Sequence, residues 1–363
     1  MRIAIAGTIA VTLLHSAASA QDVSIDTLKS DVATLCSKEF AGRSLDGARK
    51  AEAFLVERFK KLGLDTSVQD VPGFGRLECH NVIGIRRVGK EPTKEHIIVS
   101  AHYDHLGMAN GQMYPGASDN AASVAVMLEI ARLLKPIQRD VLFIGFDLEE
   151  DGFLGSGGYV KKPVRPLEEC AAFLTMDILG RELADATEGA LFATGLERSD
   201  TMFDAIAGVK PPEGLHLGYV GVDAIGARSD YVPFIPKKVP FVFFSTGEFP
   251  DYHRPTDTAD RILYDKLRKE ATLILGATRA MDTMARPKWL DKPALRIEEV
   301  SSMEVVIGQL LDNGKKLGFD NQTVIMGRVF QQWMKQVAKS GKLERHQRKE
   351  MVMHLRRLQM ALR

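Results

Sequence analysis

The alternation of apolar runs with amphipathic segments is the feature that most constrains the fold of this chain. Runs rich in β-branched and aromatic residues indicate strands at residues 81–88, 96–100, 140–146, 171–176, 191–194 and 239–244. Apolar residues at helical spacing indicate helices at residues 25–35, 46–62, 120–134 and 261–284. Several of the strands are apolar throughout, as expected when helices cover both faces of a sheet. The pattern therefore predicts an α/β fold around a largely parallel sheet.

Histidine and carboxylate residues follow several of these strands at the point where each should end. They are His102, Asp104, Asp119, Glu149, Glu150, Asp177 and His253. In such sheets the carboxyl ends of the strands form the ligand-binding edge, so we expect these side chains to converge. Imidazole and carboxylate groups are ligands that zinc prefers. Two histidines and three or four carboxylates exceed what one tetrahedral zinc needs, and they suit two metals that share a carboxylate.

Most of these residues also have a common structural interpretation. A histidine at a strand end is usually an ordinary polar residue, and Asp119 precedes a helix, where aspartate often serves as N-cap. The run Glu149-Glu150-Asp151 is typical of an acidic loop facing solvent. Asp177 differs, because a carboxylate within an apolar strand is costly unless it is paired or binds a metal.

The spacing of the polar residues suggests different roles for them. Asp104 lies two residues after His102, which allows it to hold the second ring nitrogen of that histidine. Asp257, which follows His253, is either an orienting partner or the N-cap of the next helix. Adjacent glutamates diverge at a strand end, so one can bind a metal while the other acts as general base.

The sequence argues against several other functions. No G-x-G-x-x-G follows a strand, no G-x-x-x-x-G-K-[ST] occurs, and G-x-S-x-G is absent, which disfavours a serine hydrolase. The net charge is +1; residues 286–363 hold 16 Lys/Arg against 8 Asp/Glu, and the remainder holds 32 against 39. Because only the tail is basic, we expect no nucleic-acid partner.

The first twenty residues resemble a cleavable signal peptide. Arg2 precedes an apolar run at residues 3–14, and an A-x-A site predicts cleavage after Ala20. The run is too short to span a bilayer, so we expect a periplasmic or secreted protein without stable membrane insertion. Three cysteines allow at most one disulfide, and no C-x-x-C pair supports a thiolate zinc site; Cys170 is expected to pack in the core.

A basic, helical extension follows the last helix of the main body. Pro287 and Pro293 indicate a linker, and residues 298–311 and 324–362 are amphipathic. The chain thus divides into a signal peptide at 1–20, a catalytic domain at 21–285 and an extension at 286–363. The extension is either a surface for a partner or membrane, or an appendage that packs on this chain. We expect it to pack on the catalytic domain or a second subunit, away from the metals, which allows a homo-oligomer.

Six segments of the chain, taken together, resemble one known family. They read AHYDHLG, GASDNAASVAVMLEIARLL, FDLEEDGFLGSGGYV, TMDILGR, RSDYVPF and DYHRPTDTAD. In this order they resemble the co-catalytic di-zinc aminopeptidases of clan MH, which include bacterial secreted leucyl-type enzymes and relatives of glutamate carboxypeptidase and glutaminyl cyclase. The resemblance covers about residues 40–285. It implies a three-layer α/β/α fold with a mixed, mostly parallel sheet, with the extension outside it.

The resemblance also implies roles for the residues at the strand ends. Two Zn²⁺ ions are expected, with Glu149 as general base and Asp104 as the partner of His102. One ion would be held by His102, Asp119 and Glu150, and the other by Asp119, Asp177 and His253. A cis peptide is expected after Asp119. Tyr231 departs from the family, in which histidine is common at that position, and Tyr219 is a candidate for the residue near the oxyanion.

The function that follows is exopeptidase cleavage of N-terminal residues from peptides. Glutaminyl cyclase-like aminoacyl transfer and carboxypeptidase action are the alternatives within the same family. A binding protein without catalysis would normally have lost metal ligands, whereas all five and the base are present here.

Overall fold

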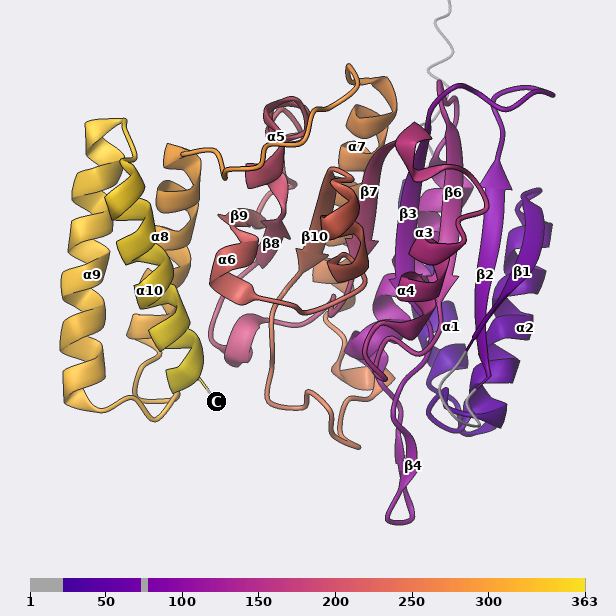
Figure 1. Cartoon of the computed structure of the whole chain (residues 1–363). Helices are drawn as coiled ribbons and strands as arrows, with labels where there is room; N and C mark the ends of the chain where they lie inside the picture. The colour runs from indigo at the N-terminus through magenta and orange to yellow at the C-terminus, as the bar shows by residue number, and fades with distance from the viewer. Residues whose placement is uncertain (1–21, 73–77, 363) are drawn as a thin grey trace, which may run out of the picture.

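The computed structural model describes residues 22–72 and 78–362, so the predicted signal peptide lies outside the described residues. Eight strands form one sheet in the order β1-β2-β6-β3-β7-β10-β8-β9 (Figure 1). Their bounds are β1 Asp65–Val71, β2 Cys79–Arg86, β3 His96–His102, β6 Asp140–Phe146, β7 Cys170–Met176, β8 Ala190–Thr194, β9 His216–Val220 and β10 Phe241–Ser245. The central strands β6, β3, β7 and β10 are parallel, while β2 and β8 run antiparallel to their central neighbours.

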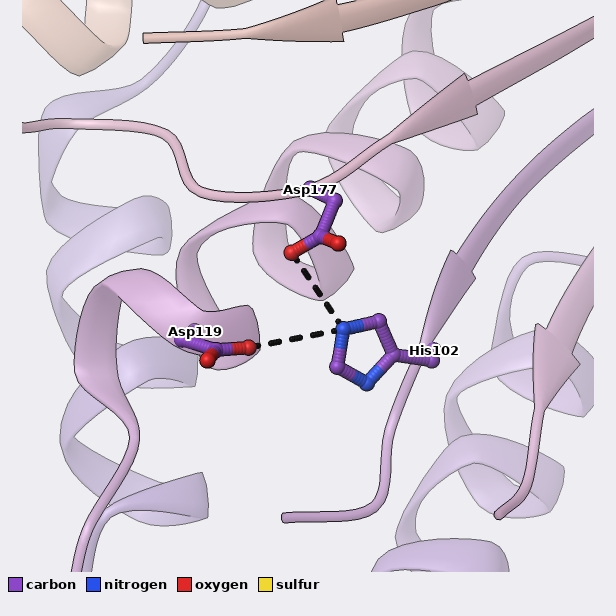
Figure 2. A group of neighbouring side chains, drawn as sticks. All are labelled: His102, Asp119 and Asp177. Atoms are coloured by element: carbon purple, nitrogen blue, oxygen red, sulfur yellow. Dashed lines mark hydrogen bonds and ion pairs between the residues drawn. The ribbon is translucent and has the colours of Figure 1, made fainter. Parts of the chain in front are cut away.

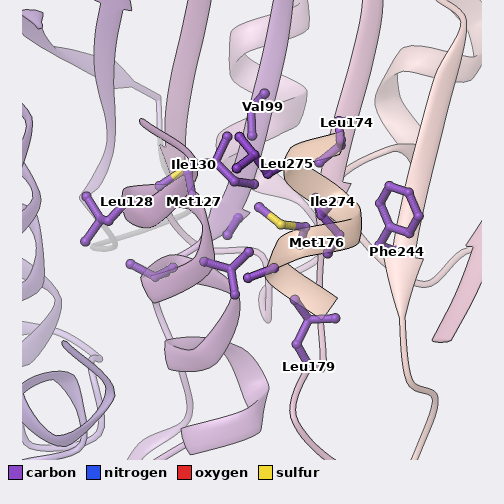
Figure 3. Packing of buried hydrophobic residues seen from close by; sticks show 14 of the residues in the cluster. Val99, Met127, Leu128, Ile130, Leu174, Met176, Leu179, Phe244, Ile274 and Leu275 are labelled. Carbon is purple, nitrogen blue, oxygen red and sulfur yellow. The ribbon is translucent and has the colours of Figure 1, made fainter. Parts of the chain in front are cut away.

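Helices cover both faces of this sheet, as predicted for strands that are apolar throughout. One face carries α1 (Ile25–Leu35), α2 (Asp46–Lys61), α3 (Ala122–Leu133), α5 (Asp200–Ala207) and α7 (Tyr264–Thr283). Side chains of α3 and α7 interdigitate there with those of the central strands, for example Met127, Val99 and Ile274 (Figure 3). The other face carries α4 (Leu154–Lys161) and the 3-10 helix Val232–Lys237. The predicted three-layer α/β/α architecture with a mixed sheet is confirmed.

The sequence located most of the central elements and missed several peripheral ones. Strands β1 and β9, the hairpin of β4 (Gly107–Ala109) and β5 (Gln112–Tyr114), and helices α4 and α5 were not predicted. These elements are short or lie at the margins of the sheet, where fewer residues are buried and periodicity is weak. The three cysteines are free.

The extension forms three helices, α8 (Ile297–Asp312), α9 (Asn321–Ser340) and α10 (Arg345–Ala361). Its apolar faces share one core with β8, β9 and the short helix α6 (Val222–Ile225). In Figure 1 the three helices stand beside β9 at one end of the sheet, and α10 crosses toward the edge where the parallel strands end. The extension therefore packs on its own chain. Among the described residues, no helix is long and apolar enough to cross a membrane.

Candidate metal centre

The predicted metal ligands converge at the carboxyl edge of the parallel strands. His102 ends β3, Asp177 directly follows β7, and Glu150 lies in the loop after β6. Asp119 comes from a short π-helical turn, Ala117–Ala121, before α3, and His253 from the loop after β10. The side chain of His253 is 35% exposed, whereas those of His102 and Asp119 are 1% and 4% exposed.

Three of these residues form a first ligand group. The Nε2 atom of His102 lies 3.3 Å from Asp177 Oδ1 and 3.5 Å from Asp119 Oδ1. Figure 2 shows the three side chains pointing at a common point from β3, the end of β7 and the turn before α3. The group is buried, so the two carboxylates lack the solvation that water would give them.

A second ligand group uses the other oxygen of the same aspartate. His253 Nε2 lies 3.2 Å from Asp119 Oδ2 and 3.1 Å from Glu150 Oε2. Asp119 thus presents one oxygen to each histidine, the arrangement that a bridging carboxylate requires. These distances divide the ligands differently from the division that the resemblance implied. Asp177 accompanies His102 and Glu150 accompanies His253, because the end of β7 adjoins β3 while the loop after β6 reaches across to the His253 loop.

The spacing of the ligand atoms fits zinc. Zn–N and Zn–O bonds of about 2.0–2.2 Å at tetrahedral angles separate neighbouring ligand atoms by roughly 3.3 Å. The four separations given above, from 3.1 to 3.5 Å, lie close to that value. The Nε2 atom of His253 is buried and makes no well-formed hydrogen bond within the described part of the chain. Such a nitrogen, facing two carboxylates, is suited to a cation.

The electrostatics of the two ligand groups also favour a bound cation. Burial favours neutral imidazole, but the charges of Glu149 and Asp177 outweigh it and raise the pKa of His102 well above its usual value. Burial is likewise outweighed at His253, where contacts with Asp119 and Glu150 raise the pKa to about 10. Without a metal, protons on the histidines therefore supply the positive charge that the carboxylates demand.

Glu149 differs from its neighbour Glu150, as the sequence suggested. Its carboxylate accepts no hydrogen bond from any described residue, and its Oε2 lies 3.9 Å from His102 Nε2. Burial raises the pKa of Glu149 well above its usual value, and the nearby Asp177 adds to the effect. Burial acts on Glu150 in the same direction, but the contacts with His105 and His253 outweigh it and lower the pKa of Glu150. One glutamate thus belongs to the ligand set, and the other lies buried beside it, outside both ligand groups.

Asp104 lies behind the first ligand group. Its Oδ1 is 3.3 Å from His102 Nδ1, the ring nitrogen that points away from the ligands, and its Oδ2 accepts a hydrogen bond from the backbone N–H of Glu150. Asp104 is therefore placed to fix the orientation of the His102 ring. A second carboxylate, Asp230, is fully buried nearby, and burial raises its pKa to about 7.

His105 is a site residue that the sequence analysis did not single out. Its ring is fully buried; Nδ1 lies 2.7 Å from Glu150 Oε1 and 3.9 Å from Asp119 Oδ2. It comes from the same AHYDHLG segment as His102, three residues further on. This second histidine in the segment was the sequence feature that could have identified His105 as a site residue. Its short contact with Glu150 holds this carboxylate toward His253.

Remote residues hold the turn that carries Asp119. Asp257 accepts hydrogen bonds from the backbone N–H groups of Ser118 and Asp119, so it neither orients His253 nor caps the next helix. The guanidinium of Arg43, fully buried, donates to the backbone carbonyl of Gly116, which precedes the turn, and to that of Asp119 within it. A side chain at Gly116 would meet Asp119 O at 2.1 Å and the ring of His105. The peptide after Asp119 is cis, as the resemblance implied.

A cavity of about 810 Å³ opens from the metal ligands. Asp119, Glu149, Glu150 and Asp177 line one part of it, and residues of the extension, among them Met303, Ile307 and Leu358, line another. The extension is therefore not remote from the metal centre, contrary to the prediction.

The two tyrosines singled out from the sequence do not line this cavity. Tyr231 is buried in the core and stacks on Phe241, with ring centroids 5.0 Å apart. Tyr219 lies on β9 and packs against Phe203 on the face that carries α5 and α7. Tyr252, whose ring stacks on His253 at 3.9 Å, lines the cavity instead.

Comparisons with known proteins agree with this geometry. The sequence profile of Peptidase family M28 matches residues 81–278. Aminopeptidase YwaD of Bacillus subtilis is 29% identical over 234 residues, which are 60% of this chain and 48% of that protein, so the chain spans about half the length of this relative. The crystal structure of LapB from Legionella pneumophila superposes with a TM-score of 0.60 at 19% identity, covering 72% of this chain and 73% of that one. Porphyromonas gingivalis glutaminyl cyclase superposes with a TM-score of 0.58 at 19% identity, covering 71% and 99%.

Proposed function

The chain belongs to peptidase family M28, and on this premise we propose that it is an exported, zinc-dependent exopeptidase that releases N-terminal residues from peptides. The observation that carries the proposal is the sharing of Asp119 between two histidine–carboxylate groups, beside a glutamate that neither group uses. The similarity to an aminopeptidase from Bacillus subtilis supports the end preference.

Each residue of the site then has a defined task. His102, Asp119 and Asp177 would hold one zinc ion, and His253, Asp119 and Glu150 the other. Two zinc ions, when bound, supply Lewis-acid polarisation of the scissile carbonyl and acidify the attacking water. Glu149 takes a proton from that water at a carboxylate oxygen and delivers it to the departing amine. The raised pKa of Glu149 makes this carboxylate a stronger proton acceptor.

Export is supported by the sequence at the start of the chain. Arg2, the apolar run and the small residues before Gln21 have the order of a cleavable signal peptide. N-terminal sequencing of the mature protein from its native host would test this, with Gln21 expected as the first residue.

Blocked peptides test the reaction itself. We expect the zinc-loaded protein to release free amino acids from a peptide with a free N-terminus and an amidated C-terminus, and none from a peptide of the same sequence with an acetylated N-terminus and a free C-terminus. The opposite pattern would identify a carboxypeptidase. A peptide beginning with glutamine separates the third possibility, because a glutaminyl cyclase releases ammonia from it and leaves every peptide bond intact.

A further inference from the structure

The cavity that opens from the metal ligands carries charged side chains along its wall, and several of them already have a partner. Arg228 forms an ion pair with Glu248 at 2.8 Å, and Asp185 forms one with Arg181 at 3.2 Å. The ammonium group of Lys316, from the loop after α8, donates a hydrogen bond to the backbone carbonyl of Asp185. The cations of Arg228 and Lys316 are therefore engaged by the protein itself.

Arg254 differs from these lining residues. It lines the same cavity, directly follows the proposed metal ligand His253 in the chain, and is exposed. Its guanidinium makes no hydrogen bond, ion pair or ring contact with any of residues 22–72 and 78–362. A guanidinium has five N–H donors and no acceptor, and it matches a carboxylate with two parallel hydrogen bonds. Arg254 thus offers a free carboxylate-binding group beside the metal centre.

The backbone that carries Arg254 is held in place on both sides. Its N–H donates to the carbonyl of Asp251, and its carbonyl accepts from the N–H of Asp257. The carboxylate of Asp251 accepts from the guanidinium of Arg181 at 2.9 Å, and that of Asp257 accepts from the backbone N–H of Ser118. These bonds tie the loop to the turn that carries the shared metal ligand, so the base of the Arg254 side chain is fixed relative to the metals.

The position of Arg254 favours a carboxylate close to the reacting bond. Because His253 and Arg254 are consecutive, their Cα atoms lie about 3.8 Å apart. In a dipeptide the residue directly after the scissile bond carries the free α-carboxylate. Each further residue of a longer, extended peptide would move that carboxylate roughly 3.3–3.6 Å away. The α-carboxylate of a dipeptide is therefore the terminal carboxylate nearest to the metals.

The charge of the metal centre does not oppose such a ligand once metals are bound. Asp119, Asp177, Glu149 and Glu150 line the cavity, and as anions they would repel a carboxylate. Two divalent cations balance four carboxylates. The charge of Arg254 then remains uncompensated and attracts an anion into the cavity.

From these observations we propose that Arg254 is a substrate-binding residue that recognises the free α-carboxylate of a dipeptide. The inference rests on the proposed function and deepens it, because it names dipeptides as the preferred substrate class. The carboxylate is not part of the bond that breaks, so its contact with Arg254 is equally strong in the ground state and in the transition state. Such uniform binding lowers KM and leaves kcat unchanged.

A matched pair of dipeptides tests the proposal. Leu-Ala and Leu-Ala-amide differ in the charge at the C-terminus and keep the same side chains. In the zinc-loaded wild-type protein we expect kcat/KM to be roughly tenfold higher for Leu-Ala, mainly through KM, which is the scale of one charge-assisted hydrogen bond. In Arg254→Gln this ratio should fall to about one. In Arg254→Glu the amide should become the better substrate, because two carboxylates would then face each other.

Arg268→Gln is the matched control. Arg268 of α7 also makes no side-chain hydrogen bond or ion pair within the described part of the chain, and it does not line the cavity. This variant should keep the wild-type ratio. Salt provides a further check, because the contact is exposed: about 1 M salt should reduce the wild-type preference. No preference for Leu-Ala in the wild-type protein, or a preference that persists in Arg254→Gln, would overturn the proposal.

Two further pairs locate the carboxylate that Arg254 recognises. Leu-Glu-amide against Leu-Gln-amide probes an acidic side chain on the second residue, and Asp-Ala-amide against Asn-Ala-amide probes one on the first. We expect neither pair to show a preference that depends on Arg254. A preference that depends on Arg254 in one of these pairs, and not in the first pair, would overturn the assignment to the α-carboxylate.

Equilibrium binding separates this inference from the proposed function. The zinc-loaded Glu149→Gln protein, in which hydrolysis should be slow, would be titrated with Leu-Ala and with Leu-Ala-amide in a calorimeter. Tighter binding of Leu-Ala that disappears when Glu149→Gln is combined with Arg254→Gln would support the inference. If the wild-type protein then hydrolysed neither peptide, the proposed function alone would fail. Hydrolysis of both peptides with equal kcat/KM would overturn the inference alone.

Discussion

Two buried charged clusters in this protein differ in the source of the positive charge that faces their carboxylates. The cluster at the ends of β3 and β7 brings His102, Asp119 and Asp177 together, and it contains no arginine or lysine. The cluster that fixes the extension pairs Arg348 with Glu299 and Asp223. The second receives a guanidinium cation from its own chain, whereas the first draws positive charge from protons or from a bound cation. The comparison teaches that a buried acidic cluster marks a site when the fold supplies no cation to it.

Among the changes predicted here, removal of the proposed general base, Glu149, should have the largest effect on activity. In Glu149→Gln we expect kcat to fall roughly 10²- to 10⁴-fold, the usual contribution of a general base. Zinc content measured by atomic absorption should stay at the wild-type value, because Glu149 belongs to neither ligand group. Asp151→Asn, two residues along the same loop, serves as the control and should keep wild-type kcat. Full activity in Glu149→Gln would remove this residue from the mechanism.

Loss of the arginine in the second cluster should act on stability and not on metal content. Arg348→Met leaves the carboxylate of Glu299 buried without a cation, which typically costs about 3–5 kcal/mol. Denaturant unfolding should record that loss, and zinc stoichiometry in the folded fraction should remain that of the wild-type protein.

A double variant sharpens the same test. Arg348→Met combined with Glu299→Gln should regain part of the lost stability, because the buried carboxylate that lost its cation is then removed. Arg345→Met, an exposed neighbour on α10, should change little. Loss of zinc from Arg348→Met would show that the two clusters depend on each other.

The orienting carboxylate behind His102 should have an intermediate effect. Asp104→Asn keeps the size of the side chain but removes the charge 3.3 Å from the ring nitrogen. We expect zinc affinity to fall about 10- to 100-fold, as is usual when such a partner is lost. Competition with a chromophoric chelator would measure this change. Unaltered affinity would assign Asp104 a role in packing alone.

The smallest effect concerns protons and follows from the direction of the histidine pKa shifts. Without zinc the pKa of His253 is about 10 and that of His102 is also raised, so both rings are protonated at pH 7. Zinc binds neutral imidazole, and its binding should therefore release about one to two protons per chain. Apparent zinc affinity should rise with pH, and the binding enthalpy should vary with the ionisation enthalpy of the buffer. A binding enthalpy independent of the buffer would contradict these pKa directions.

The sequence determined which chemistry meets at the sheet edge. Residues that end parallel strands must lie at one edge, so the positions of His102, Glu149 and Asp177 after continuous apolar runs sufficed to bring them together. The same periodicity predicted the central strands, the long helices and an extension with apolar faces. These features depend on local spacing, and local spacing is what a single sequence carries.

Tertiary structure decided how the ligands are divided and what surrounds them. Glu150 accompanies His253 and Asp177 accompanies His102 because strand order and loop paths set the distances between segments far apart in the chain. Arg43 and Asp257 support the turn of Asp119 from remote positions, and no local pattern distinguishes them from ordinary charged residues. The placement of the extension at the cavity has the same origin. Amphipathic spacing shows that a helix face must be buried, but the complementary surface that buries it exists only in the folded molecule.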